Sequence, residues 1–308
     1  MAFSELIALY LFLGGASAGS FAVISSIDLA TAFVHARDRR YARTPTHYFG
    51  SRSRSVTQRR VARLVYSVAF AMIVLGLTCL LADLGRPDAF YMIFLYPTAS
   101  FMSLGAFALA FLAICMAIAL AEAVLVLSPA WEKAALVAKA AGVVLSLVVM
   151  LYTGMLLETV VAVPLWRSTW LPVLFLFSSL SCGCAVVLIS TCFCESYEGI
   201  RAWTRKLIAA DVAAVALEVV SAAALTISVN AASASRPFDA LLVGDQAGLF
   251  WLGFVGCGIL APLMVELPAL IARRRHASGV VAAMSLLVLV GGFCLRLALV
   301  NAGVQVAV

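Results

Sequence analysis

Long apolar stretches, separated by mostly short polar connections, run through the whole chain. Each stretch is about as long as the roughly 20 residues that a helix needs to cross the hydrocarbon core of a bilayer. The strict alternation of a membrane barrel is absent from them, so they predict helices that satisfy their own backbone hydrogen bonds. The eight predicted spans are Leu6–Val34, Ala62–Ala82, Pro97–Leu127, Ala134–Val163, Trp170–Phe193, Leu207–Asn230, Gly248–Ile271 and Gly279–Val300.

Composition supports an all-α integral membrane protein. Of the 308 residues, 64% are hydrophobic and 12% are charged, whereas a soluble domain has roughly 25% charged residues. The first apolar run resembles a signal peptide in Ala16-Ser17-Ala18, but it carries Glu5 where a positive segment is expected and continues past Ala18. We therefore expect a retained first helix and a multi-pass protein of the cell's inner, cytoplasmic membrane.

Basic residues are distributed unevenly among the connections. Lys and Arg gather between Arg37 and Arg63 and after the third, fifth and seventh runs, whereas the opposite connections hold only Arg86, Arg167 and Arg236. Positive connections stay in the cytoplasm, which predicts that both termini face outward. The net charge of +6 is thus a topology signal, and we expect a lipid membrane and no nucleic acid as the partner of these residues.

Histidine and cysteine usage argues against a metal or haem in this chain. The three histidines, His35, His47 and His276, lie in or beside the basic connections, whereas membrane haems need axial ligands that project into a helix bundle. Two C-x-C pairs in the fifth run, beginning at Cys182 and Cys192, suggest a metal site. Their members point in different directions on a helix, so small packing residues are the simpler interpretation.

Polar residues of several spans share a depth near the outer surface. A quinone head group would suit this level, because its two oxygens need hydrogen-bonding partners and its tail needs apolar surroundings. The candidate hydrogen-bonding residues are Tyr10, Tyr152 and Thr153, and the candidate proton acceptors for quinol oxidation are Asp83 and Glu158. Other interpretations stay open. Tyr10 would belong to an aromatic belt at the membrane surface, and Asp83 would pair with Arg86 to end its helix. Glu158 would extend its carboxylate to the outer interface.

Other polar and small residues inside the spans have less defined roles. Glu218 falls near the middle of the sixth span and must be paired, protonated or functional, with Arg296 of the eighth span as a possible partner. We expect solvated roles for Asp28, Glu122 and Glu266 near the cytoplasmic helix ends. Gly14, Gly15 and Gly19 give the first span a small-residue face for another helix or a flat ligand.

Several short motifs occur in order along nearly the whole chain. They are Tyr10-Leu-Phe-Leu-Gly-Gly-Ala-Ser-Ala-Gly19, Asp83-Leu-Gly-Arg-Pro87, Tyr152-Thr-Gly154, Pro164-Leu-Trp166, Phe177-Ser-Ser-Leu-Ser-Cys-Gly183, Gly291-Gly-Phe-Cys-Leu-Arg296 and Asn301-Ala-Gly303. Together they resemble the NrfD-like family, the membrane subunits of polysulfide-reductase-type molybdopterin enzymes, and the DLGRP turn at Asp83 and the terminal GGFxLR motif are the more specific ones. Leu297 and Val304 depart from the family pattern at the end of the last span.

The resemblance implies two four-helix bundles, residues 1–163 with the quinol site and residues 164–308. It also implies a haem-free anchor that oxidises an exchangeable quinone such as menaquinone near the outer face and passes electrons to an iron–sulfur subunit and a molybdopterin catalytic subunit. Asp83 and Glu158 would then serve in catalysis, and the expected quinone-binding residues are Tyr10, Gly15, Arg86, Tyr152 and Thr153.

Two other functions stay open. One is a secondary transporter or proton-translocating subunit that uses Glu218, Arg296 and Glu158. Neither a helix break near the membrane centre nor an internal repeat is evident, and both are common in transporters. The other is a purely structural anchor whose quinone site has degenerated.

Overall fold

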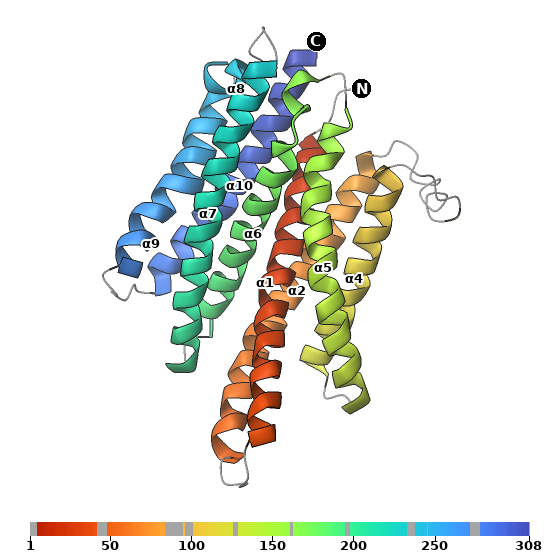
Figure 1. Ribbon diagram of the computed structural model, residues 1–308, viewed down its shortest axis with the longest axis vertical. Helices are drawn as coiled ribbons and strands as arrows, with labels where there is room; N and C mark the ends of the chain where they lie inside the picture. Colours follow the sequence, from red (N-terminus) through yellow and green to blue (C-terminus); the bar gives the residue numbers. More distant parts are fainter. Residues whose placement is uncertain are drawn as a thin grey trace.

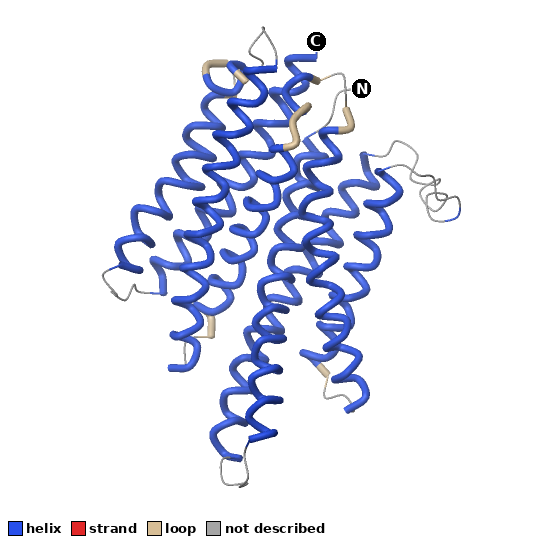
Figure 2. Tube along the Cα trace, in the orientation of Figure 1, coloured by secondary structure: helices blue, strands red, loops and turns tan. Residues whose placement is uncertain are grey.

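The structure of the protein, a computed structural model, is built from helices (Figure 2). It describes residues 5–41, 48–83, 95, 101–125, 129–160, 163–194, 198–232, 238–244, 246–271 and 278–307. Within these ranges no residue is in a strand. The helices, in chain order, are α1 (Glu5–Tyr41), α2 (Tyr48–Asp83), α4 (Phe101–Val124), α5 (Pro129–Glu158), η2 (Pro164–Trp166), α6 (Trp170–Cys192), α7 (Glu198–Ala232), α8 (Asp239–Leu242), η3 (Leu249–Leu260), α9 (Ala261–Ile271) and α10 (Ser278–Ala307).

Eight helical segments of the described chain are long and apolar enough to cross a membrane, which confirms the predicted spans. The polar connection expected between the first two spans is largely helical instead, because α1 continues to Tyr41 and α2 begins at Tyr48. Arginine and glutamine are good helix formers, so both helices extend beyond the apolar sequence that crosses the bilayer.

The helices run side by side along the long axis of the molecule (Figure 1). α1 begins and α10 ends at the same end, which we call the terminal end. α1, α6 and α9 end, and α2, α7 and α10 begin, at the opposite end, which we call the basic end because the sequence around these helix ends is rich in Lys and Arg. Which end faces the cytoplasm remains the prediction drawn from the positive connections.

The packing contacts show where the two halves of the chain meet. α1, α2, α4 and α5 pack on one another, and α6, α7, η3, α9 and α10 form a second group. α1 also packs on α6 as extensively as it packs on α5. The two groups therefore share a broad seam, and their description as two separate four-helix bundles stays a prediction.

Small residues bring the helices together at this seam and elsewhere. A Cβ built on Gly19 of α1 would collide with the carbonyl group of Ser179, and one built on Gly183 of α6 would collide with the backbone of Gly19. At the terminal end, the ring of Trp166 fills the space beside Gly303, and its indole N–H donates to the Leu299 carbonyl oxygen at 3.0 Å. The glycines of the family motifs thus serve close helix packing here, as small residues do in membrane proteins.

The seventh span departs from a regular α-helix. Residues Leu249–Leu260 form a π-helix, and the Ala261 N–H bonds to the Gly256 carbonyl oxygen, five residues earlier. The chain then continues as α9, which contains Pro268. The sequence does carry a signal at this point: Pro262, two residues after the π-helix ends, has no backbone N–H to donate. Such π-segments are frequent near functional sites.

Candidate functional site

Two buried tyrosines lie in the terminal half of the first helix group. Tyr10 of α1 is 1% exposed and Tyr152 of α5 is 6% exposed. Gly105 of α4 makes room for the Tyr152 ring, because a Cβ there would overlap it, and the Tyr10 ring lies beside Gly76 of α2, where a Cβ would be at the van der Waals distance of 3.8 Å. The two side chains are close enough to interact electrostatically. The structure thus brings together the two tyrosines that the sequence suggested.

The Tyr10 hydroxyl has no hydrogen-bond partner among the described residues, although its oxygen is buried. Thr153, the third expected hydrogen-bonding residue, is fully buried, and its hydroxyl donates to the Met150 carbonyl oxygen at 2.7 Å. Its proton is therefore used within α5, and its oxygen lone pairs are what it can offer to a ligand. The Tyr10 phenol is therefore the buried group of this region that has unused hydrogen-bonding capacity for a ligand.

The two expected proton acceptors lie closer to the helix ends. Asp83 is the last residue of α2 and Glu158 the last residue of α5, and both are partly exposed. Six residues separate Glu158 from Tyr152, so the two side chains project from different faces of α5. Arg86 lies outside the described residues.

Gly15, an expected quinone-binding residue, lies at the seam between the helix groups. A Cβ at this position would meet the Ser179 hydroxyl of α6 and would lie 3.0 Å from Nη2 of Arg296. The space beside Gly15 is thus filled by protein, which favours the helix-packing role that the sequence also allowed. Its quinone-binding role stays a prediction.

Arg296 of α10 is fully buried at the junction of α1, α6 and α10. One of its terminal nitrogens donates to the Ser178 hydroxyl at 3.2 Å and to the Gly292 carbonyl oxygen at 2.8 Å, and the other donates to the Ser179 hydroxyl at 2.7 Å. The guanidinium carbon also lies 5.8 Å and 5.2 Å from two phenylalanine ring centres, those of Phe12 and Phe175. The groups in these direct contacts with the buried cation are neutral hydroxyl and carbonyl groups and aromatic rings.

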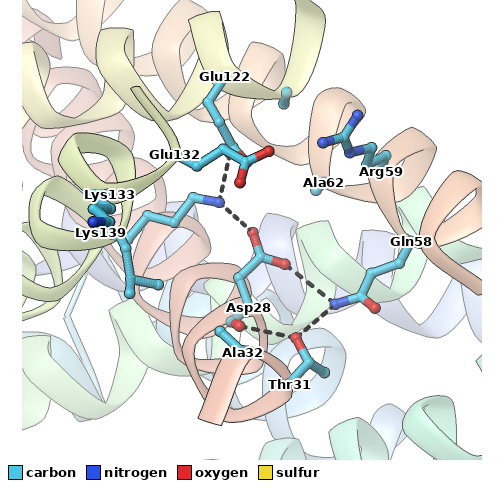
Figure 3. Close-up of a pocket in the computed structure, with 12 residues that line it drawn as sticks. Asp28, Thr31, Ala32, Gln58, Arg59, Ala62, Glu122, Glu132, Lys133 and Lys139 are labelled. Carbon is cyan, nitrogen blue, oxygen red and sulfur yellow. Dashed lines mark hydrogen bonds and ion pairs between the residues drawn. The ribbon is translucent and has the colours of Figure 1, made fainter. Parts of the chain in front are cut away.

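A second polar site lies toward the basic end of the first helix group (Figure 3). It is a cavity of about 580 Å³ between α1, α2, α4 and α5. The charged and polar residues that line it include Asp28, Gln58, Arg59, Glu122, Lys133 and Lys139. Cationic and anionic side chains are interspersed, so the cavity wall is not dominated by one sign of charge.

Lys139 joins two acids in this cavity. Its ammonium nitrogen lies 2.8 Å from Asp28 Oδ2 and 2.8 Å from Glu122 Oε2 (Figure 3). Asp28 also accepts from the Tyr66 hydroxyl at 2.9 Å and from the Gln58 amide at 3.4 Å. The expected solvated roles of the two acids are therefore wrong: they are largely buried and are held by a lysine that sequence reasoning counted as a basic residue of the connection. Two acids near the basic ends of the first and third spans were the available signal, since such residues need a counter-charge.

The second helix group also holds acids that sequence reasoning missed or misplaced. Asp211 of α7 was not singled out, yet it is fully buried. Glu266 was expected to be solvated, but it is only 4% exposed, because α9 packs against α7 and α10. Glu218 is buried as expected, also at 4% exposure. Within the described chain, no group of three or more His, Cys, Asp or Glu side chains is arranged to hold a metal ion.

The cysteines suggested by their spacing as a metal site do not pair with one another. All eight are free thiols, and Cys182 and Cys184 are buried in α6. The side chains of the three histidines lie outside the described residues, so the expectation of a haem-free chain stays a prediction.

Comparison with known proteins identifies the family. Residues 1–308 match the family model described as polysulphide reductase, NrfD. A curated relative, the C subunit of polysulfide reductase from Wolinella succinogenes, is 32% identical over 165 residues, which cover 52% of this chain and 51% of the relative. The chain therefore matches about half the length of that relative. Because the family model spans the whole chain, and as the sequence motifs indicated, this multi-pass membrane protein belongs to the polysulphide reductase NrfD family.

Proposed function

We propose that the protein is the haem-free membrane anchor of an oxidoreductase complex, which binds quinol between Tyr10 and Tyr152 and oxidises it. Membership of the NrfD family supports the anchor role, as does a relative that is named as one subunit of a polysulfide reductase. In this proposal the protein sits in the inner membrane with its terminal end outward. There an iron–sulfur subunit accepts the electrons and passes them to a molybdopterin catalytic subunit.

The observation that carries the quinol site is the buried, unsatisfied hydroxyl of Tyr10, for which the described part of the chain supplies no partner. A buried polar group without a hydrogen bond destabilises a protein by about 1–3 kcal/mol, so such a group is retained where it binds something else. A quinone carbonyl oxygen is a suitable acceptor for a phenol, and a quinol hydroxyl is a suitable donor to it. Tyr152 of α5, which packs against α1, brings a second phenol hydroxyl to the proposed site.

The chemistry of quinol oxidation divides between this chain and its partners. Oxidation releases two electrons and two protons. The electrons require a redox centre, which the proposal places in the iron–sulfur subunit. The protons require bases, and Asp83 and Glu158 at the ends of α2 and α5 are partly exposed carboxylates from which a proton can reach water. Thr153 lies one residue from Tyr152, where its hydroxyl oxygen can accept a hydrogen bond from the quinol.

Gly15 and Arg86 are the remaining two residues of the proposed site. Gly15 makes the close α1–α6 contact described above, so its contribution would be to position α1. Arg86 follows α2 by three residues and would hold the anionic form of the head group or pair with Asp83.

The assembly is tested by affinity purification of the tagged protein from its native membrane. We expect iron–sulfur and molybdenum subunits to co-purify, with no haem absorption in the visible spectrum. Purification of the chain without either subunit, or with bound haem, would refute the proposed role.

The quinol site is tested in the purified complex by quinol oxidation. Asp83→Asn and Tyr152→Phe should each lower the rate, whereas Glu5→Gln, which neutralises an exposed acid at the terminal end of α1, should not. The proposed site is wrong if both site variants oxidise quinol at the normal rate.

A further inference from the structure

Three acids lie buried in the second helix group, away from the proposed quinol site. Asp211 and Glu218 are seven residues apart on α7, which places them on one face and about 10 Å apart along the helix. Glu266 belongs to α9, which packs against α7. All three are at most 4% exposed. Because a charged side chain is costly at membrane depth, three such residues in one helix group need an explanation beyond packing.

The acids form a line that begins near the basic end. Glu266 lies in the middle of the short helix α9, five residues before its end at the basic end, and Asp211 lies in the first half of α7, which starts there. Glu218 lies near the middle of its apolar span, and Arg296 lies in the terminal half of α10. Neighbouring members of the line are close enough to interact electrostatically: Glu266 with Asp211, Asp211 with Glu218, and Glu218 with Arg296.

Several polar atoms on this line have unused hydrogen-bonding capacity. The Ser181 hydroxyl donates to Oδ1 of Asp211 at 2.7 Å, but Oδ2 has no partner in the described structure. Oε1 of Glu266 and Nε of Arg296 are buried and equally without a partner from the described residues. Ser178 connects the far end of the line, because its hydroxyl accepts from Arg296 and also interacts with Glu218.

The arrangement does not fit a static ion-pair network or a cation site. One buried arginine faces three acids, and no ion pair with N–O separation within 4 Å joins it to any of them in the part of the chain that is described. Among the described residues, no group of three or more His, Cys, Asp or Glu side chains is arranged to hold a metal ion, so the three acids do not form a cation site. A carboxyl group with one oxygen held and the other unused can accept a proton on one side and release it on the other, which is what a proton relay requires.

We propose that Glu266, Asp211 and Glu218 form a proton pathway that leads from the basic end of the second helix group to Arg296. A proton from water binds Glu266, and each acid in turn takes up one proton and releases one to the next, so no electron moves and no group is consumed. Arginine does not release its proton in proteins. Arg296 therefore ends the pathway, and its positive charge repels a proton that has reached Glu218.

The pathway does not depend on the proposed quinol site. Arg296 meets α1 at Phe12 and Gly15, whereas the Tyr10 ring packs toward Gly76 of α2. The two sites thus lie on different sides of α1, and a test of one does not decide the other.

Infrared spectroscopy of the purified chain in lipid vesicles tests the pathway without quinol or partners. Protonated carboxyl groups give a carbonyl stretch separate from the amide bands, and the band lost in Glu218→Gln belongs to Glu218. After transfer to D₂O this band shifts as its proton is exchanged. We expect Asp211→Asn and Glu266→Gln to slow that shift by about a hundredfold, the lower end of what a positioned acid–base group contributes to proton transfer.

Glu132→Gln serves as the matched control, because Glu132 is an exposed acid of α5 outside the line; its exchange rate should equal that of the unchanged protein. Circular dichroism establishes that each variant keeps its helices, and Ser181→Ala replaces Asp211→Asn if that variant does not. The proposal is overturned if Glu218 exchanges at the same rate in every variant, or if no protonated Glu218 band exists at neutral or acidic pH.

Discussion

A single substitution, Tyr10→Phe, distinguishes a ligand-binding role of the Tyr10 hydroxyl from a structural one. Tyr10→Phe removes one oxygen atom and leaves the ring in its place against Gly14 and Gly76. That oxygen is buried and has no partner from the described residues. In the ligand-free protein, the substitution therefore removes a hydroxyl that has lost its hydrogen bonds to water on folding and has gained none in return.

Tyr10→Phe is expected to have opposite effects on the stability of the ligand-free protein and on its affinity for quinone. Without ligand, Tyr10→Phe should leave the free energy of unfolding unchanged or raise it, by up to about 1–3 kcal/mol, the cost of an unsatisfied buried group. With quinone bound, the variant lacks one hydrogen bond worth about 0.5–1.5 kcal/mol, which weakens binding by roughly threefold to tenfold. A purely structural tyrosine would lose stability and leave affinity unchanged.

Both quantities can be measured on the purified chain. Unfolding in mixed detergent micelles gives the free energy of unfolding, and calorimetric titration with a soluble quinol analogue gives Kd. Thr78→Ser, at an exposed position of α2 outside the proposed site, keeps a hydroxyl for the bond to the Leu75 carbonyl oxygen; it is the control and should change neither quantity much. Normal affinity together with lower stability in Tyr10→Phe would refute the reasoning.

Three further substitutions test the packing and the charges, with the free energy of unfolding in mixed micelles as the measurement. Lys139→Met should destabilise the protein by about 3 kcal/mol, because it leaves two largely buried carboxylates without their cation. Gly19→Ala should cost about 1–3 kcal/mol, because its methyl group would meet the Ser179 carbonyl and force α1 away from α6. Trp166→Phe should cost at least about 1 kcal/mol, since it removes the indole bond to Leu299 and leaves a void beside it.

Each of these has an outcome that would contradict it. For Lys139→Met, a loss below about 1 kcal/mol, the upper range for solvent-exposed pairs, would mean that the acids are effectively solvated. For Gly19→Ala the matched control is Gly279→Ala, where a Cβ meets nothing within 4 Å and alanine should be neutral or stabilising. Equal stabilities of the two glycine variants would show that the α1–α6 contact is not close. Unchanged stability of Trp166→Phe would contradict the role given to the indole.

Sequence alone predicted the features that depend on local composition and order along the chain. Apolar length predicted eight spans, and the motifs around Tyr10, Asp83 and Arg296 indicated the family. The burial of Tyr152 and Glu218 also followed from their positions inside apolar runs. The helix ends were less well predicted, as at Tyr41, because a helix continues into polar sequence without any change in its backbone hydrogen bonding.

Which residues meet across the helices was decided by the tertiary structure. Lys139 meets Asp28 and Glu122 only because α1, α4 and α5 pack together, and Asp211 faces Glu266 only because α9 lies against α7. In a soluble helix, the apolar stripe marks the buried face. In a membrane helix the lipid is as apolar as the protein interior, so hydrophobic periodicity does not mark the face that meets other helices. The sequence therefore determined how many helices cross the membrane, and packing determined which of their polar residues act together.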